Sequence, residues 1–265
     1  MNQQRSYRIL AVYTFIICCF SPAAVIVILI ESLTSADYVS FPPVGLSLRW
    51  YLEIPRRPEF IASLTTSLIV AAGAAIISTI IGTLAALALV RYRFPGRALL
   101  QTLFLSPLSV PAIVLGIALL QFYAAHSIPR NTFVLVLTHV LITSPYTIRL
   151  VSVSLVAFER NLELAARNLG AGPWTTFRRI TMPLIRPGMM AGGVFAFIVS
   201  FDDISVTLFL TSSTSMTLPV RIYTYIDQSY DPFITSISSI LILIVAVLAI
   251  VIERTIGIGK LFGVR

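Results

Sequence analysis

The sequence predicts an all-α membrane protein with six transmembrane helices, and three observations support this prediction. Of the 265 residues, 57% are hydrophobic and only 11% are charged, whereas soluble domains are usually about 25% charged. The mean hydropathy is +0.92. Six apolar runs are each long enough to cross a bilayer, which takes about 20 helical residues. A soluble core cannot bury so many apolar side chains, so lipid must be the main solvent.

The six runs are separated by polar or proline-rich segments. They lie at residues 9–31, 61–90, 99–125, 132–157, 188–210 and 233–253. The first run is longer than the roughly 7–15 apolar residues of a cleaved secretory signal, so we expect it to remain as a span. The third contains Pro107 and Pro111, whose missing backbone hydrogen bonds another helix or a water-lined cavity must compensate. This pattern favours a packed bundle with a pathway over a simple anchor.

The basic residues of the connecting segments predict the orientation. With six spans, both termini and the loops 91–97 and 158–187 fall on one side, which carries most of the arginines together with Lys260 and Arg265. Short basic loops resist translocation, so this side is expected to be cytoplasmic. The opposite side holds Arg49, Arg56, Arg57, Arg130 and Arg221. The net charge of +8 is therefore attributed to membrane topology and not to nucleic acid.

Segment 158–187 is too polar to cross the membrane and too patterned to be a slack linker. Its first half, ERNLELAARNL, consists of good helix formers and is followed by Gly170, the residue type that favours a helix C-terminus. Pro173 then suits the first turn of a second short helix, PWTTFRRI. We expect Pro183 and Pro187 to end that helix, which gives a helix, a tight turn and a helix on the cytoplasmic face.

Several kinds of chemistry have no matching motif. The string GIGIGKLF at 255–262 lacks both the spacing and the hydroxyl residue of a nucleotide-binding loop. His126 and His139 are too far apart for a helical metal pair, and adjacent Cys18 and Cys19 are expected to pack as small apolar groups. No G-x-S-x-G nucleophile elbow occurs. The chain is therefore expected to be neither an enzyme nor a metal protein.

Residues 163–183 contain small residues and prolines at fixed spacing. Ala165, Ala166 and Gly170 are followed by Ile180 and Pro183. This pattern resembles the cytoplasmic signature of ABC-importer permeases, E-A-A-x-x-x-G followed nine residues on by I-x-L-P. The glutamate of the signature falls on Leu164, with Glu163 beside it, and Met182 stands at the usual leucine.

The resemblance extends over most of residues 41–253. FPPVGLSLRWY, GTLAALALVRYRFPGR, FLSPLSVPAIVLGIALL and SFDDISVTLFLTSS all resemble the polyamine (spermidine/putrescine) branch of these permeases. It implies the type I ABC importer permease fold with both termini cytoplasmic. It also implies partners: a second permease, expected to be a different chain, two ATPase subunits that bind ATP and Mg, and a periplasmic or extracellular substrate-binding protein. No cofactor is expected in this chain.

The resemblance also implies a role for the cytoplasmic segment. It is similar to the coupling helix that sits in a groove on the ATPase, where small residues allow close approach and arginines pair with acids. The residues implied in this contact are Glu163, Ala165, Ala166, Gly170, Arg178, Ile180 and Pro183. A short rigid helix transmits movement of the ATPases to the spans better than a loop does.

Two adjacent aspartates, Asp202 and Asp203, lie within the fifth apolar run. An aspartate at the centre of a membrane helix costs on the order of 2.5–3.5 kcal/mol, so these two should face the bundle interior or water. On a continuous helix, Asp203 shares one polar stripe with Ser200 and Thr207, and Asp202 lies on a neighbouring stripe.

Three interpretations of the aspartates stay open. They can be structural, paired with arginine or with backbone donors at a helix break. They can line the path of a cationic substrate, because carboxylates compensate the several kcal/mol per ion that an ammonium loses on leaving water. They can form a protease dyad, although neighbours on one helix point about 100° apart. The substrate-pathway residues are expected to be Asp202, Asp203, Ser200 and Thr207.

The sequence therefore predicts a multi-pass permease of the bacterial inner membrane that imports polyamines or related amines by ATP-driven alternating access. The alternatives are an importer of the same class for an ω-amino acid, an aminophosphonate or an opine, and an ion-coupled secondary transporter. We expect residues 1–60 to form the first span and an external loop. Residues 61–265 are expected to form the core permease domain, with the coupling segment 158–187.

Overall fold

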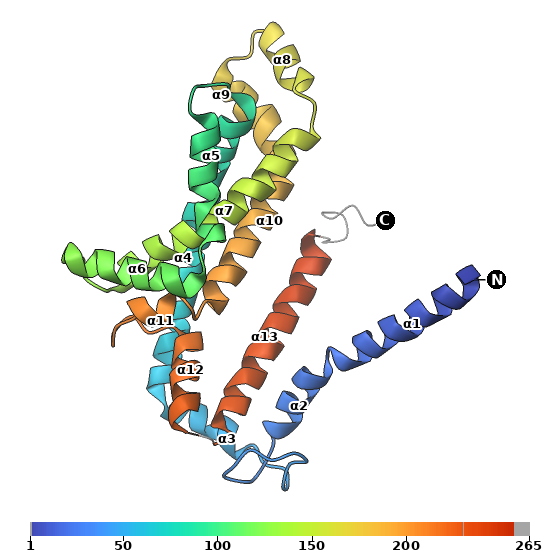
Figure 1. Cartoon of the computed structure of the whole chain (residues 1–265), viewed down its shortest axis with the longest axis vertical. Coiled ribbons are helices and arrows are strands. Elements are labelled where there is room, and N and C mark those ends of the chain that lie inside the picture. The colour runs from blue at the N-terminus through green and yellow to red at the C-terminus, as the bar shows by residue number, and fades with distance from the viewer. Residues whose placement is uncertain (1, 230, 257–265) are drawn as a thin grey trace. The chain divides into compact units, whose positions relative to one another are not determined.

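The computed structural model describes the backbone of residues 2–229 and 231–256, and nearly all of it is helical (Figure 1). Over these residues the one contact of β type is an isolated antiparallel bridge between Thr34 and Leu46. The predicted all-α class is confirmed. Lys260 and Arg265, which contributed to the predicted orientation, lie outside the described residues, as does most of the string at 255–262.

The helices follow one another in the order labelled in Figure 1. They are α1 (Asn2–Phe20), α2 (Ala23–Glu31), α3 (Arg49–Glu53), α4 (Pro58–Arg91), α5 (Arg97–Leu105), α6 (Ala112–Ala125), α7 (Thr132–Ala157), α8 (Asn161–Asn168), α9 (Pro173–Thr176), α10 (Met182–Asp202), α11 (Thr207–Leu210), α12 (Leu218–Gln228) and α13 (Phe233–Ile256). Short 3₁₀ turns cover Ile54–Arg56 and Ser106–Ser109, and a π-helical turn covers Phe177–Thr181.

Four described segments are long and apolar enough to cross a membrane: Leu10–Glu31, Pro58–Arg91, Thr132–Ala157 and Pro173–Asp202. Three of them match predicted runs. The fourth differs from the expected span at 188–210, because the helix begins before Pro183 and ends at Asp202. The sixth predicted run corresponds to α13, whose apolar part is Phe233–Val247. The number of six spans and the cytoplasmic position of both termini stay predictions.

The third predicted run is not a straight helix. Its two parts, Arg97–Ser109 and Ala112–Ala125, meet at an angle of 107°. Val110 and Pro111 between them are extended, because proline has no N–H for the helical ladder and disfavours helical geometry in the residue before it. Beyond the bend, Gly116 of α6 approaches the backbone of Ser205 and Val206, where a Cβ would lie about 3.2 Å from each.

The described chain forms two compact units. The first comprises Met1–Ile61 and Ile222–Arg265, and the second comprises Ala62–Arg221. In the first unit α13 packs on α2 and α3. The second unit contains most of α4 together with α5 to α11. The predicted division into a first span with an external loop, residues 1–60, and a core permease domain, residues 61–265, stays a prediction.

Small residues hold α7 and α10 together in the second unit. A Cβ added to Gly188 would lie 2.9 Å from the carbonyl oxygen of Leu150, and one added to Gly192 would lie 3.2 Å from Cα of Thr147. Such close contacts are typical of membrane helices, which associate by van der Waals packing. The buried side chains of Val151, Leu155 and Ile185 fill the adjoining layer.

We expect Gly188→Val to loosen this pair of helices. The valine would overlap both the Ser154 side chain and the Leu150 backbone, and overpacking of this kind costs about 1–3 kcal/mol. The thermal midpoint of the detergent-purified protein should fall by about 5 °C. Gly172→Ala is the control, since its Cβ meets open space. Equal midpoints for the two variants would contradict the packing described here.

Candidate functional site

The segment between α7 and α10 begins with the helix that the sequence predicts. After α8, the N–H of Gly170 donates to the carbonyl oxygen of Arg167 at 2.9 Å, and the N–H of Ala171 donates to that of Ala166 at 3.0 Å. Gly170 has φ +87°, the left-handed conformation in which glycine carries no Cβ penalty. This is a Schellman C-terminus. The predicted helix and its tight turn are therefore confirmed.

The second half of the segment differs from the prediction. Pro183 and Pro187 do not end a short helix, because α9, the π-helical turn and α10 form one uninterrupted helical segment, Pro173–Asp202. Pro183 occupies the first turn of α10, directly after the π-helical residues Phe177–Thr181. A wider turn accommodates the ladder position at which proline supplies no N–H. The segment is thus joined to α10 without a loop.

Glu163 of α8 is paired inside the chain. Its Oε2 lies 3.2 Å from Nε of Arg91, and the two side chains are only 14% and 12% exposed. The Thr181 hydroxyl donates to Glu163 Oε1 at 2.7 Å, and the Arg91 guanidinium lies 4.4 Å from the ring centroid of Phe158. Glu163 therefore joins α8 to the last residue of α4 and to the π-helical turn before α10.

The other residues implied in coupling lie mainly at the surface of the described chain. Ala165, Gly170, Arg178 and Pro183 are exposed, and Ala166 and Ile180 are half-buried. Two large apolar side chains stand out beside them, Leu169 at 90% and Trp174 at 70% exposure. A hollow of about 480 Å³ lies behind, lined among others by Leu84, Arg91, Leu164 and Phe177. The role of this tip as a contact surface for the ATPase stays a prediction.

Glu163→Gln is expected to loosen the segment while leaving its helices in place. Glutamine keeps an acceptor for Thr181 but leaves the Arg91 charge unpaired, and breaking a buried pair costs on the order of 3–5 kcal/mol. Trypsin cleavage at the exposed Arg160 and Arg167 should become about 100-fold faster. Glu159→Gln is the matched control, because Glu159 is exposed. Unchanged cleavage in Glu163→Gln would show that the pair does not hold the segment.

The structure separates the two aspartates. Helix α10 ends at Asp202, which is exposed, and Asp203 takes extended geometry with ψ 121°. Oδ2 of Asp203 accepts hydrogen bonds from the N–H of Val206 at 3.2 Å and of Thr207 at 2.9 Å, and from the Thr207 hydroxyl at 2.8 Å. Asp203 therefore caps the turn that follows α10, as the structural interpretation of the pair predicts, whereas the role of Asp202 stays a prediction.

The predicted polar stripe comes together in a different way. Ser200 and Thr207 are not on one helix, because the helix ends between them, but both contact the buried side chain of His139 in α7. Nδ1 of His139 lies 2.7 Å from Oγ of Ser200, and Nε2 lies 3.0 Å from Oγ1 of Thr207. Three elements, α7, α10 and α11, thus meet in one hydrogen-bonded group.

Sequence reasoning missed two residues here. His139 was considered only as a metal ligand, and Arg149, inside the span 132–157, was not used. Arg149 is exposed on α7. Ionisable residues inside a membrane span are functional candidates by default, and this rule would have selected both. Within the part of the chain that the structure describes, no three His, Cys, Asp or Glu side chains are grouped to hold a metal ion.

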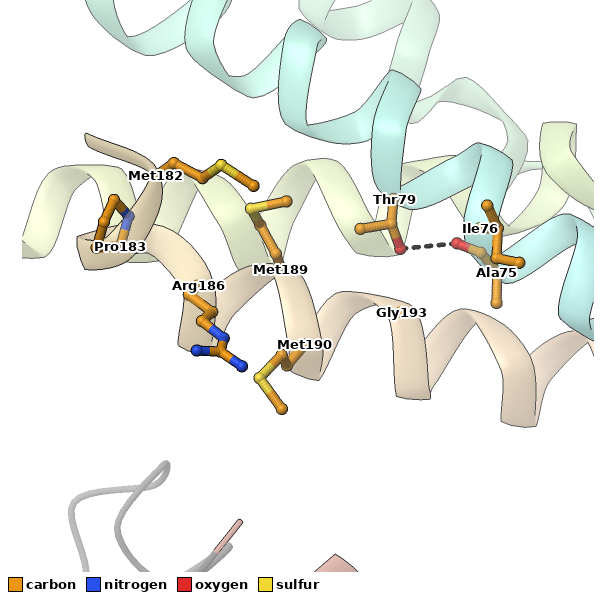
Figure 2. A pocket seen from close by; sticks show the side chains of 9 residues that line it. All are labelled: Ala75, Ile76, Thr79, Met182, Pro183, Arg186, Met189, Met190 and Gly193. Atoms are coloured by element: carbon orange, nitrogen blue, oxygen red, sulfur yellow. Dashed lines mark hydrogen bonds between the residues drawn. The ribbon is translucent and has the colours of Figure 1, made fainter. Parts of the chain in front are cut away.

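A hollow of about 660 Å³ opens between α4 and α10 (Figure 2). The two helices approach closely at its narrow end, where a Cβ on Gly193 would lie 2.9 Å from Oγ1 of Thr79. That hydroxyl is used locally, since it donates to the Ala75 carbonyl oxygen at 2.7 Å. Toward the start of α10 the lining includes Pro183, Arg186 and three methionines; the methionines are Met182, Met189 and Met190. Flexible thioether side chains suit a surface that changes its contacts.

In the first unit, a charged cluster joins Arg57 to the residues around the start of α13. The Arg57 guanidinium hydrogen-bonds to the Tyr225 hydroxyl and lies 3.8 Å from Asp231 and 4.0 Å from the ring centroid of Phe233. Burial raises the pKa of the Tyr225 phenol, and its hydrogen bond to Asp231 raises it further. Burial alone would lower the pKa of Arg57, but Tyr225 and the two carboxylates, Asp231 and Glu53, raise it. At neutral pH the Tyr225 phenol is therefore neutral and the Arg57 guanidinium is charged, so the phenol accepts from Arg57 and donates to Asp231 at 2.6 Å.

Comparisons with known proteins agree with this architecture. Residues 78–258 match the family described as binding-protein-dependent transport system inner membrane component. The chain is similar to a bacterial ABC transporter involved in the import of the acidic polysaccharide alginate, with a TM-score of 0.76 and 17% identity over 96% of this chain and 98% of that one. The predicted importer-permease fold is confirmed by this likeness.

Curated relatives are more similar in sequence. The putrescine transport system permease protein PotI of Escherichia coli strain K12 is 31% identical, covering 84% of this chain and 82% of the relative. The spermidine/putrescine transport system permease protein PotC of the same strain is 29% identical, covering 85% of each. A putative 2-aminoethylphosphonate transport system permease protein, PhnV of Salmonella typhimurium strain LT2, is 29% identical, covering 93% and 92%. This chain belongs to the family of binding-protein-dependent transport system inner membrane components, as a permease subunit of an ABC importer in the inner membrane.

Proposed function

We propose that this chain is the permease subunit of an ATP-driven importer of polyamines or related cationic amines. The observation that carries the proposal is the placement of Asp202 and Asp203, one exposed and one held by the chain itself, at the end of α10. The relatives named for putrescine and for spermidine support it. Putrescine, spermidine and 2-aminoethylphosphonate all carry an ammonium group, so a carboxylate site is the chemistry that these substrates share.

The two carboxylates offer an ammonium group different contacts. Asp202 presents an exposed carboxylate at the last turn of α10. Asp203 uses Oδ2 for three hydrogen bonds, while Oδ1 makes one long contact of 3.5 Å to the Val206 N–H. Oδ1 is therefore left to accept from a passing donor. Two adjacent negative charges compensate the hydration that a diammonium substrate loses in the membrane. The likeness to an importer of an acidic polysaccharide concerns the fold alone, so substrate charge is set by side chains such as these.

The partner ATPase subunits, and not this chain, bind and hydrolyse ATP. The exposed tip that includes Leu169, Trp174 and Arg178 is the surface we assign to the ATPase, with Glu163 holding it in place from behind. A second permease and a substrate-binding protein complete the importer, with two ATPases binding ATP and Mg. The binding protein delivers the amine, ATP binding opens the path outward, and hydrolysis returns it to the inward-open state. Family membership favours this mechanism over the ion-coupled alternative.

The second candidate substrate is an aminophosphonate, which the relative PhnV favours. Its anionic group would be repelled by Asp202 and Asp203 and would need a cationic partner. Arg186 in the hollow between α4 and α10, or Arg149 on α7, would supply one from this chain. The aminophosphonate therefore requires a basic residue in the path that a polyamine does not require.

Reconstitution tests the proposed function. The tagged chain is purified with its co-purifying subunits, inserted into proteoliposomes and supplied with ATP, the binding protein and labelled putrescine, spermidine or 2-aminoethylphosphonate. We expect ATP-dependent accumulation of putrescine or spermidine, with unlabelled amines competing and 2-aminoethylphosphonate failing to compete. Accumulation of 2-aminoethylphosphonate alone would overturn the amine assignment, and uptake without an ATPase would overturn the importer assignment.

A further inference from the structure

His139 is a titratable side chain that the proposed transport cycle does not use, although it is fully buried. Its exposure is 0%, and its two hydrogen-bond partners, Ser200 and Thr207, are 3% and 0% exposed. Burial of an imidazole without water requires that both ring nitrogens find partners. The structure provides one on each side, and each belongs to a segment that adjoins the aspartates.

The hydrogen bonds fix which ring nitrogen carries the proton. The Thr207 hydroxyl has one hydrogen, and it is donated to Oδ2 of Asp203 at 2.8 Å. Thr207 can therefore only accept from His139, so Nε2 must be protonated. In the neutral ring Nδ1 then accepts from the Ser200 hydroxyl at 2.7 Å. The four groups form a directed chain that runs from Ser200 through His139 and Thr207 to the Asp203 carboxylate.

We propose that His139 is a positioning residue for the amine site: it orients the Thr207 hydroxyl toward Oδ2 of Asp203 and leaves Oδ1 to bind a substrate ammonium group. The inference rests on the proposed function. The imidazole belongs to α7, which lies outside the segment that carries the aspartates. His139 therefore links the substrate site to the helix that packs along α10. Without the Nε2 donor, the Thr207 hydroxyl is free to turn, and Oδ2 of Asp203 then keeps only its two backbone donors, the N–H groups of Val206 and Thr207.

Two amide variants separate the two sides of the ring. In His139→Gln the amide nitrogen lies near the position of Nε2 and retains a donor for Thr207. In His139→Asn the amide lies near Nδ1, so it retains an acceptor for Ser200 and loses the donor for Thr207. Both variants are smaller than histidine, and asparagine is the smaller of the two by one methylene, so their comparison in the Asp203→Asn background separates this difference in volume from the hydrogen bond.

The test measures ATP-dependent putrescine uptake by the complete reconstituted importer. We expect His139→Asn to raise KM about tenfold with little change in the maximal rate, and His139→Gln to stay within about threefold of the wild-type KM. In the Asp203→Asn background the two variants should no longer differ, because they act through that carboxylate. Equal KM values for the Asn and Gln variants, or a difference that persists in Asp203→Asn, would overturn the inference.

A second measurement does not depend on the substrate. In a double-mutant cycle on the thermal midpoint of the purified complex, His139→Asn should cause little further loss once Thr207→Val has removed the shared hydroxyl. Additive losses would show that the two residues act separately. Should the wild-type importer take up 2-aminoethylphosphonate and not putrescine, the amine assignment fails, and the same cycle together with KM for that substrate decides the role of His139.

Discussion

Replacing both Asp202 and Asp203 by asparagine is expected to abolish putrescine and spermidine uptake while the complex with the ATPase still assembles. The double variant removes both negative charges from the end of α10 but keeps side chains of the same shape. Each buried ammonium loses several kcal/mol of compensation, which corresponds to a fall in uptake of roughly 100-fold or more. Uptake into proteoliposomes and co-purification of the ATPase measure the two properties separately.

The single variants divide the effect between the two carboxylates. Asp203→Asn keeps a side-chain oxygen that caps the following turn, and asparagine caps about as well as aspartate, whereas Asp203→Ala removes the cap at a cost of about 1 kcal/mol. Asp202→Asn changes only an exposed side chain. We expect Asp202→Asn to reduce uptake without lowering the thermal midpoint. Normal transport by the assembled double variant would refute the pathway assignment of these residues.

Placing tryptophan at Gly170 is expected to disconnect ATP hydrolysis from transport, or to prevent assembly altogether. Within the chain a side chain at this position meets open space, so the indole would project from the surface that we assign to the ATPase. The effect should be close to complete, because a bulky ring on a docking surface excludes the partner. Co-purification of the ATPase, and the ratio of ATP hydrolysed to putrescine accumulated, are the measurements.

The backbone of Gly170 requires its own control, because φ +87° costs most residues about 1–2 kcal/mol. Asparagine tolerates this conformation better than other residues with a Cβ. Gly170→Asn should therefore retain most of the coupled uptake and show that strain alone does not explain the tryptophan variant. Coupled uptake by Gly170→Trp at the wild-type level would mean that this surface is not where the ATPase binds.

The helical class and most membrane spans could be predicted from the sequence because long apolar runs have few alternatives in a bilayer. The errors lie at prolines. Pro111 lies inside the third predicted run, as expected, but at a sharp bend that the sequence does not predict. Pro183 is expected to end a helix and instead lies inside one. A proline fixes its own φ and lacks an N–H, but whether the helix stops, bends or widens depends on the packing around it.

The candidate site was partly predictable for a similar reason. Burying two adjacent acids in an apolar run costs free energy, so Asp202 and Asp203 could be selected as functional candidates from the sequence alone. Their different environments could not, because the contact of Asp203 with the backbone depends on where α10 ends. The partnership of His139 with Ser200 and Thr207 joins residues more than 60 positions apart, and no local pattern encodes such a contact. The ion pair between Glu163 and Arg91 could not be predicted for the same reason, because these residues are also far apart in the sequence.

The unbroken helical segment Pro173–Asp202 has a mechanical consequence. At a rise of 1.5 Å per residue it is about 45 Å long, so a tilt of about 5° at its Trp174 end would displace the Asp202 end by about 4 Å. Under the proposed function it would act as a lever, with the surface that we assign to the ATPase near one end and Asp202 at the other. A subtle rocking of the nucleotide-driven partners would then be enough to reposition the carboxylates against a bound amine, with no hinge residue required between them.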